Sequence, residues 1–276
     1  MTWHLGRLAA FDTETTGVDV ETDRIVTAAV DARGGGMEPE AGEWLADPGV
    51  EIPVEAYNVH KISTEHAREH GDPAEQVVHE VTAELAAQVV KGGAAIVGHN
   101  VAFDLTLLDR ECRRYGLPTL HDRLDGHPLH VIDTRVLDQH AVPYRRRVSE
   151  KQGARQLITL AQFYGLPWDD EAAHGCSYDA VAAARIAWRI GQLAHSRRRD
   201  WPERVLAERR LRFHAFRDLT LAELHALQVE LAAEQAAGLQ KHFRKTDPNA
   251  VVDGSWPLRP SVEPTATTDE PEGATA

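Results

Sequence analysis

The segment from Leu8 to Gly17 brings two carboxylates to the end of an apolar strand. It reads Leu-Ala-Ala-Phe-Asp-Thr-Glu-Thr-Thr-Gly, and the closing Thr-Thr-Gly indicates a sharp turn. Alternate residues of a strand point to the same face, so Asp12 and Glu14 project together. Two like charges this close repel each other, and a cation between them relieves the repulsion. The segment therefore predicts metal-dependent phosphoryl chemistry.

The composition of the 276-residue chain is that of a soluble globular protein, with 42% hydrophobic residues. The two cysteines, Cys112 and Cys176, fit neither a zinc pattern nor a disulfide framework, which favours a reducing, cytoplasmic location. The N-terminus lacks the apolar stretch of a signal peptide. No apolar run is long enough to span a bilayer, so we expect no membrane partner.

The net charge of −13 is unevenly distributed along the chain. Residues 1–195 contain 18 Lys and Arg residues and 30 Asp and Glu residues. The corresponding counts are 11 and 8 for residues 196–247, and 1 and 5 for residues 248–276. A protein that grips a few nucleotides through metals does not need a basic surface. The charge is therefore compatible with a nucleic-acid substrate but does not predict one.

Strands come first along the chain and then alternate with helices. The predicted strands are residues 8–12, 24–32, 42–45, 94–98 and 129–133, the first three forming an antiparallel meander with a Gly34-Gly35-Gly36 turn. The predicted helices are residues 63–70, 73–90, 101–115, 134–140, 153–164 and 178–194. This order predicts an α/β fold with a central mixed sheet of about five strands and helices on both sides.

The chain divides into three sections. Residues 1–195 form the predicted catalytic domain, residues 196–258 a helical C-terminal extension, and residues 259–276 a disordered acidic tail. Within the extension, Thr220 and Glu223 have the spelling of a capping box at the start of a leucine-striped helix. Packing on the core is the default for such a stripe, and dimerisation or docking of a partner are the alternatives.

Two further acids and a histidine occupy helix starts and loops. Asp104 follows a strand end and Asn100, which is suited to capping the next helix. Asp179 opens the last helix of the core, with Ser177 as the expected N-cap. His174 lies in the preceding loop. The carboxyl ends of strands gather functional groups in open α/β sheets, so we expect these side chains to converge.

Taken in order, these residues resemble the DEDDh family of 3′–5′ exonucleases, and within it most closely the epsilon proofreading subunits of bacterial replicative polymerases. The resemblance rests on Asp-x-Glu-Thr-Thr-Gly from Asp12, Asn-x-x-Phe-Asp from Asn100, and His-x-x-x-x-Asp from His174 to Asp179. It covers roughly residues 5–195. It implies a ribonuclease-H-like fold and release of the 3′-terminal nucleotide as a 5′-monophosphate.

The same residues suit phosphodiester hydrolysis on chemical grounds. Two divalent cations about 4 Å apart can clamp the attacking and leaving oxygens of a displacement. The four carboxylates of Asp12, Glu14, Asp104 and Asp179 supply the hard oxygen ligands that Mg²⁺ or Mn²⁺ prefers, and their charge balances two dications. Imidazole has a pKa near the working pH, so His174 is the expected general base.

Five further residues are predicted to contact the substrate. The family resemblance implies that Glu55 and His60, in Glu-Ala-Tyr-Asn-Val-His, touch the terminal nucleotide. The family often continues His-Gly-Ile, whereas this chain has Lys61 before Ile62, a departure that affects substrate contact and not the metal site. We also expect a substrate-binding role for Thr13, Asn100 and Phe103, with the hydrophobic core as the alternative for Phe103.

Other conspicuous residues receive structural interpretations. We expect Asp133 to cap the helix that follows it, and His99 to be a packed or capping histidine. Arg145-Arg146-Arg147 is interpreted as a solvated loop in preference to a phosphate contact. Gln228-Val229-Glu230-Leu231 only faintly resembles a sliding-clamp motif, because it lies within a predicted helix.

We therefore predict a metal-dependent 3′–5′ exonuclease that acts on single-stranded or frayed DNA ends. A relative that prefers RNA or short oligoribonucleotides is the nearest alternative, because discrimination would depend on the 2′-hydroxyl. A non-catalytic adaptor of a polymerase is a further alternative, but it would be expected to have lost one of the five key residues. The C-terminal extension is the expected docking segment for a DNA polymerase or another replication or repair partner.

Overall fold

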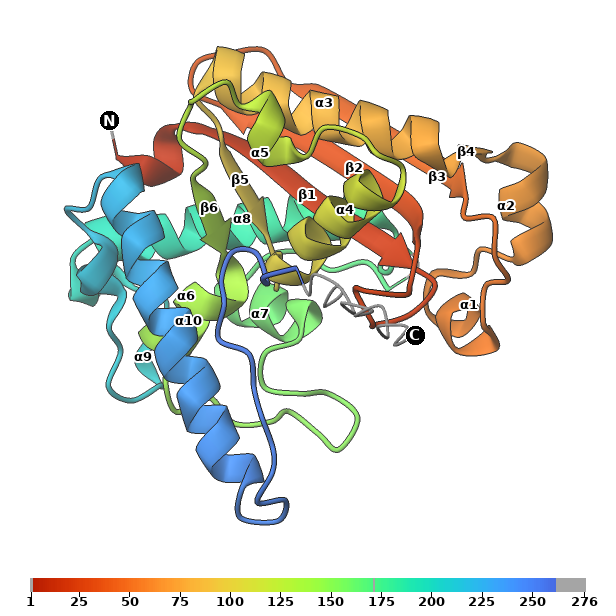
Figure 1. The fold of residues 1–276 in the computed structure, drawn as a ribbon. Coiled ribbons are helices and arrows are strands. Elements are labelled where there is room, and N and C mark those ends of the chain that lie inside the picture. The colour runs from red at the N-terminus through yellow and green to blue at the C-terminus, as the bar shows by residue number, and fades with distance from the viewer. Residues whose placement is uncertain (1, 171, 262–276) are drawn as a thin grey trace, which may run out of the picture.

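The computed structural model describes residues 2–170 and 172–261, and a mixed sheet lies at its centre (Figure 1). The sheet has six strands in the order β4-β3-β2-β1-β5-β6. Their bounds are Arg7–Thr15 (β1), Ile25–Gly34 (β2), Glu40–Asp47 (β3), Asp72–Pro73 (β4), Ala95–Gly98 (β5) and Val131–Asp133 (β6). The predicted mixed sheet is confirmed; the additional strand is the two-residue β4.

The strand pairing follows the predicted meander. β1 pairs with β2, and β2 with β3, in antiparallel register, while β5 runs parallel to both β1 and β6. The turn after β2 uses Gly34, Gly35 and Gly36, all with positive φ, a conformation that residues with a Cβ rarely adopt. The carboxyl ends of the parallel strands β1, β5 and β6 therefore meet at one edge region of the sheet.

Helices cover both faces of the sheet (Figure 1). Their bounds are Val54–His60 (α1), Thr64–His70 (α2), Ala74–Gly92 (α3), Ala102–Arg114 (α4), Leu120–Arg123 (α5), Thr134–Ala141 (α6), Leu157–Tyr164 (α7), Cys176–His195 (α8), Glu203–Leu206 (α9) and Leu221–Phe243 (α10). One buried cluster joins α3 and α4 to Phe11, Ile96 and Val131. A second large cluster joins α6, α7 and α8 to Ala10, Val97 and Ile132. This alternation along each strand directs Asp12 toward the α8 face.

Three helix starts differ from the sequence predictions. α7 begins at Leu157 and not at Gly153, because Gly153 donates its backbone N–H to the side chain of Gln156 in a turn. α8 begins at Cys176 with Gly175 as N-cap, so the expectation of Ser177 as the cap was wrong. The side chain of Asn100 does not cap α4 either, because it accepts a hydrogen bond from Arg135 instead.

The extension after residue 195 folds back onto the sheet. The predicted capping box of Thr220 and Glu223 is confirmed at the start of α10. Gln228 on this helix is fully buried, and its amide accepts the N–H of Asp133 (2.7 Å) and donates to the carbonyl of Val131 (2.9 Å). This helix face therefore packs on the sheet, the default expected for its leucine stripe, and the faint resemblance of this segment to a clamp motif has no further support.

The end of the described chain lies against α4. The backbone N–H of Arg259 donates to Thr106, and Arg110 donates to the carbonyls of Arg259 and Pro260. Most of the predicted disordered tail, residues 262–276, lies outside the described residues. Among the residues described, no helix combines the length and the apolar character needed to cross a bilayer.

Candidate active site

Asp12 and Glu14 lie on the last residues of β1, on the same face of the strand. The burial of β1 is continuous from Arg7 to Phe11 and becomes partial at Asp12, Glu14 and Thr15, where the strand leaves the core. Between the two acids, Thr13 points to the other face and is buried. The strand alternation inferred from sequence is thus the geometry that pairs the carboxylates.

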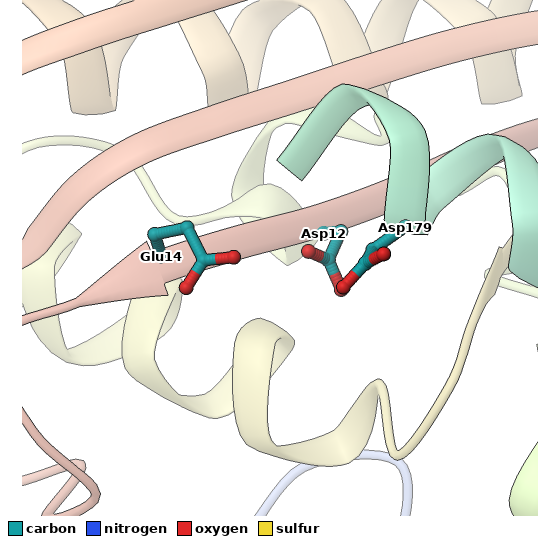
Figure 2. Close-up of side chains that lie close together, drawn as sticks. All are labelled: Asp12, Glu14 and Asp179. Atoms are coloured by element: carbon teal, nitrogen blue, oxygen red, sulfur yellow. The ribbon is translucent and has the colours of Figure 1, made fainter. Parts of the chain in front are cut away.

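Asp179, in the first turn of α8, completes a cluster of three carboxylates. One oxygen from each of Asp12, Glu14 and Asp179 can be chosen so that all lie within 4.8 Å of one another. Figure 2 shows the Asp12 and Asp179 carboxylates turned toward each other, with Glu14 approaching from farther along β1. α8 crosses the sheet on this side, so packing of the helix delivers its first turn to the strand end.

Asp104, on the first turn of α4, lies beside this cluster and is held from the opposite face of β1. Its Oδ1 accepts hydrogen bonds from the backbone N–H of Thr13 (3.1 Å) and from the Thr13 hydroxyl (2.7 Å). Thr13 therefore orients a carboxylate, and its predicted contact with substrate stays a prediction. Asp104 is near enough to act as a neighbouring charge on Asp12 and Glu14.

The electrostatics of the cluster oppose ionisation. Burial, and then the neighbouring charges of Asp104, Asp179 and Glu14, raise the pKa of Asp12 well above its ordinary value. Burial and the charges of Asp179 and Asp104 raise the pKa of Glu14 to about 8. Burial also raises the pKa of Asp104 to about 7, against the hydrogen bonds from Thr13. Carboxylates crowded in this way favour a bound cation.

His174 lies in the loop that leads into α8. It is exposed and has a left-handed backbone, with φ of 65°. Burial raises the pKa of Asp179, and the charge and backbone of His174 oppose that shift. Both residues line a cleft of about 880 Å³, which also contains Asn100. The structure therefore places His174 and Asp179 on the same cleft, and the role of His174 as general base stays a prediction.

Asp133 organises two of the residues that line this cleft, Asn100 and Arg135. Its Oδ1 accepts the backbone N–H groups of Asn100 (3.0 Å) and of Arg135 (2.9 Å), and the side chain caps α6, as predicted. Asn100 has a left-handed backbone, and its side-chain oxygen accepts from Arg135 (2.7 Å). Arg135 and Lys151, which line the cleft, were not singled out from sequence, because neither belongs to a recognisable motif.

The predicted nucleotide-contact segment forms α1, which Figure 1 places beyond the end of β1. Glu55 is exposed on its first turn, whereas His60 at its last residue is buried and accepts the backbone N–H of Ile62. Burial lowers the pKa of His60, an effect opposed by the backbone of Thr15 at the end of β1. Lys61, in left-handed conformation, ends the helix.

Several sequence interpretations are settled by contacts around the cleft. Both ring nitrogens of His99 lie 2.9 Å from oxygens, the Thr134 hydroxyl and the Arg155 carbonyl, so His99 is a packed histidine as predicted. Phe103 is half-buried and packs against the core cluster of α3 and α4. Arg145 does not belong to a solvated loop, because it is bound to the buried Asp138.

Comparison with known proteins places this arrangement in a family. The RNase_T family model, described as "Exonuclease", matches residues 9–187, which contain all five residues of the predicted catalytic set. The chain therefore belongs to this exonuclease family, and the family resemblance seen in the motifs is confirmed.

Curated relatives of this chain include DNA polymerases III of the PolC type. That of Lacticaseibacillus paracasei is 27% identical over 180 residues, which are 65% of this chain and 11% of the relative. That of Streptococcus sanguinis is 29% identical over 178 residues, 64% of this chain and 10% of the relative. The chain thus matches about a tenth of the length of these polymerases.

Among solved structures, the fold is similar to that of exonuclease I. The enzyme from Methylocaldum szegediense has a TM-score of 0.54 at 20% identity, covering 72% of this chain and 42% of that one. E. coli exonuclease I in complex with a dT13 oligonucleotide has a TM-score of 0.53 at 19% identity, covering 67% and 41%. The expected ribonuclease-H-like exonuclease fold is therefore confirmed.

Proposed function

We propose that this protein is a 3′–5′ exonuclease that removes nucleoside 5′-monophosphates from single-stranded or frayed DNA ends. The observation that carries the proposal is the cluster of Asp12, Glu14 and Asp179 in a member of an exonuclease family. DNA is favoured over RNA because similar solved structures are complexes of exonuclease I with dT13 and dA16 oligonucleotides, and because the curated relatives are DNA polymerases.

The side chains present fit hard divalent cations such as Mg²⁺ or Mn²⁺. Their donors are carboxylate oxygens, and Asp179 Oδ1 is buried without a hydrogen-bond partner among the described residues. Asp12, Glu14 and Asp179 would hold the metal together with Asp104 as fourth carboxylate. Two such cations, when bound, would offset the charge that develops on the phosphoryl oxygens.

The remaining steps belong to the side chains. His174 would take the proton from the attacking water, and its exposure leaves the ring free to approach a substrate in the cleft. Thr13 fixes the orientation of Asp104. We assign Glu55, His60 and Phe103 to the terminal nucleotide, and Asn100 to the wall of the cleft beside it.

A role beside a replicative polymerase is the partner proposal that follows from the relatives. The curated relatives are whole PolC-type polymerases, of which this chain matches one segment. The C-terminal extension would provide the docking surface, since it contributes exposed residues outside the matched range 9–187. A non-catalytic adaptor is disfavoured, because all five predicted catalytic residues are present.

The test is digestion of 5′-labelled single-stranded DNA and of RNA with the same sequence, in Mg²⁺ or Mn²⁺, by the wild type and Asp12→Ala. We expect stepwise shortening of DNA from the 3′ end, slower shortening of RNA, and loss of both in the variant and in EDTA. Faster trimming of RNA would replace DNA with RNA as the substrate. Absence of metal-dependent cleavage by folded protein would refute the proposal.

A further inference from the structure

The segment between α6 and α7 borders two separate clefts. One is the cleft of about 880 Å³ that contains His174 and Asp179. The other, of about 820 Å³, lies between this segment, the outer side of α7 and α9. Consecutive residues line different clefts: Ser149 borders the first and Val148 the second. A chain leaving the catalytic cleft across this segment therefore enters the second one, which we call the upstream groove.

The lining of the upstream groove is basic and partly aromatic. Arg146, Arg204 and Arg209 border it, with Glu208 as the acid among its lining residues. Tyr144 also borders it and is 53% exposed, with Arg210 over its ring at 5.3 Å and bonded to its hydroxyl. A chain with net charge −13 therefore concentrates arginine beside its catalytic cleft.

Two of the four arginines that border this groove, Arg145 and Arg204, are committed to the fold. Arg145 stacks on Phe163 at 3.8 Å and bonds Asp138, and Arg204 donates to the carbonyl of Phe163 (2.8 Å). The Arg204 contact fixes α9 against α7, and the Arg145 contacts fix the segment between α6 and α7. The exposed Arg146 and Arg209 come from these two segments, one from each side of the groove.

We infer that the upstream groove binds single-stranded DNA on the 5′ side of the nucleotides held in the catalytic cleft. Arginine with an exposed aromatic ring is the composition that suits a flexible single strand, because the cations follow phosphates and the ring stacks on a base. Basic residues continue into the cleft that contains His174 and Asp179, because Arg135 and Lys151 line it and Lys151 belongs to the segment that the two clefts share. The inference rests on the proposed function for the polarity of the strand.

This groove gives the extension after residue 195 a role in substrate binding. Arg204, Arg209 and Arg210 lie outside the family match of residues 9–187, so the family domain supplies one wall and the extension the other. The enzyme would then hold long single strands more tightly than short ones, while the chemistry at the 3′ end is unchanged.

The test compares Arg146→Glu/Arg209→Glu with a matched double reversal, Lys91→Glu/Lys241→Glu, whose residues are exposed on α3 and α10 and border neither cleft. Binding of labelled dT24, dT4 and a blunt 24-base-pair duplex is measured by fluorescence anisotropy in EDTA across a salt series. Cleavage of dT4 is measured separately in Mg²⁺.

We expect the groove variant to bind dT24 about tenfold more weakly than the control. The slope of the logarithm of the binding constant against the logarithm of salt concentration should become shallower by about 1.4, because two phosphate contacts are lost. Binding and cleavage of dT4 should stay within about twofold of the control. A dT24 affinity equal to that of the control would overturn the inference, as would an equal loss on dT4 or on the duplex. Because binding is measured without metal, failure of DNA cleavage by the wild type would refute the proposed function alone.

Discussion

Asp138 on α6 and Asp12 on β1 are both acids withdrawn from solvent in the same fold, and their surroundings differ. Asp138 is fully buried and accepts from Arg145 and from the Tyr164 hydroxyl (2.8 Å), with Arg155 Nε at 3.4 Å. Asp12 instead faces other carboxylates, and burial with their charge raises its pKa. The first acid has its cations within the protein. The second has no cationic partner among the residues that the structure describes, which is the property expected of a site for an external cation.

This contrast teaches how to separate structural from functional buried charge. A motif search finds Asp12 but says nothing of Asp138, although both are aspartates in buried surroundings. The charge of the neighbouring side chains distinguishes the two aspartates. Removal of Asp138 would leave two arginines without their counter-charge, whereas removal of a charge from the cluster around Asp12 would relieve repulsion. The four predictions below measure that difference, beginning with the largest effect.

Replacement of Glu14 by Gln should abolish function while leaving the fold intact. We expect DNA cleavage to fall by about 1,000-fold or more, because a weakened metal site loses several kcal/mol of transition-state stabilisation. The metal-free variant should melt at a temperature equal to or above that of the wild type, because the neutral amide stays uncharged at a pH where Glu14 ionises beside other carboxylates. Steady-state cleavage and thermal melting in EDTA measure both. A variant that is inactive and also less stable would make Glu14 a structural residue.

Replacement of Asp138 by Asn should have the opposite effect. The free energy of unfolding should fall by about 3–5 kcal/mol, because two buried guanidinium groups lose their carboxylate. Denaturant titration measures it, with Asp200→Asn as control, since Asp200 pairs with Arg197 on the surface and such pairs contribute about 0–1 kcal/mol. Equal losses for the two variants would refute the assignment of Asp138 as a compensated buried charge.

Replacement of Gln228 by Ala removes a buried side chain that is polar but uncharged. Its effect on stability should lie between those of the Glu14 and Asp138 replacements. The replacement leaves the N–H of Asp133 and the carbonyl of Val131 without the side-chain amide that bonds them. We expect the free energy of unfolding to fall by about 1–3 kcal/mol. Val229→Ala on the exposed face of the same helix is the control, with a change near zero. Equal stabilities of the two variants would show that the amide contributes nothing.

The smallest expected effect is on pH dependence. The pKa of Glu14 rises from 4.5 to about 8 on folding, so the native metal-free protein binds more protons than the unfolded chain between these values. Its stability should therefore decrease as pH rises from about 5 to 8, by about 1 kcal/mol after allowance for partial exposure and salt screening. Glu14→Gln should show a shallower decrease. Parallel pH profiles in EDTA for the two proteins would contradict this prediction.

The fold and the carboxylates were accessible from the sequence because their signals are local. Strand alternation placed Asp12 and Glu14 on one face, and helix starts placed Asp104 and Asp179 at strand ends. The roles that sequence missed depend on contacts across the chain. Thr13 reaches Asp104 over 91 positions, and Gln228 reaches Asp133 over 95. Arg145 was misjudged for a different reason, since its acid is only seven positions away and the burial of the pair depends on packing against α7.

The position of Gln228 also bears on the edge of the sheet at β6. β6 is the outermost strand on its side of the sheet, and such a strand exposes backbone groups that can pair with another chain. The Gln228 amide offers one acceptor and one donor, as a peptide group does, and the ring of His225 accepts the N–H of Val131. The α10 helix thus acts as a surrogate strand, and the sheet is closed to extension on this side.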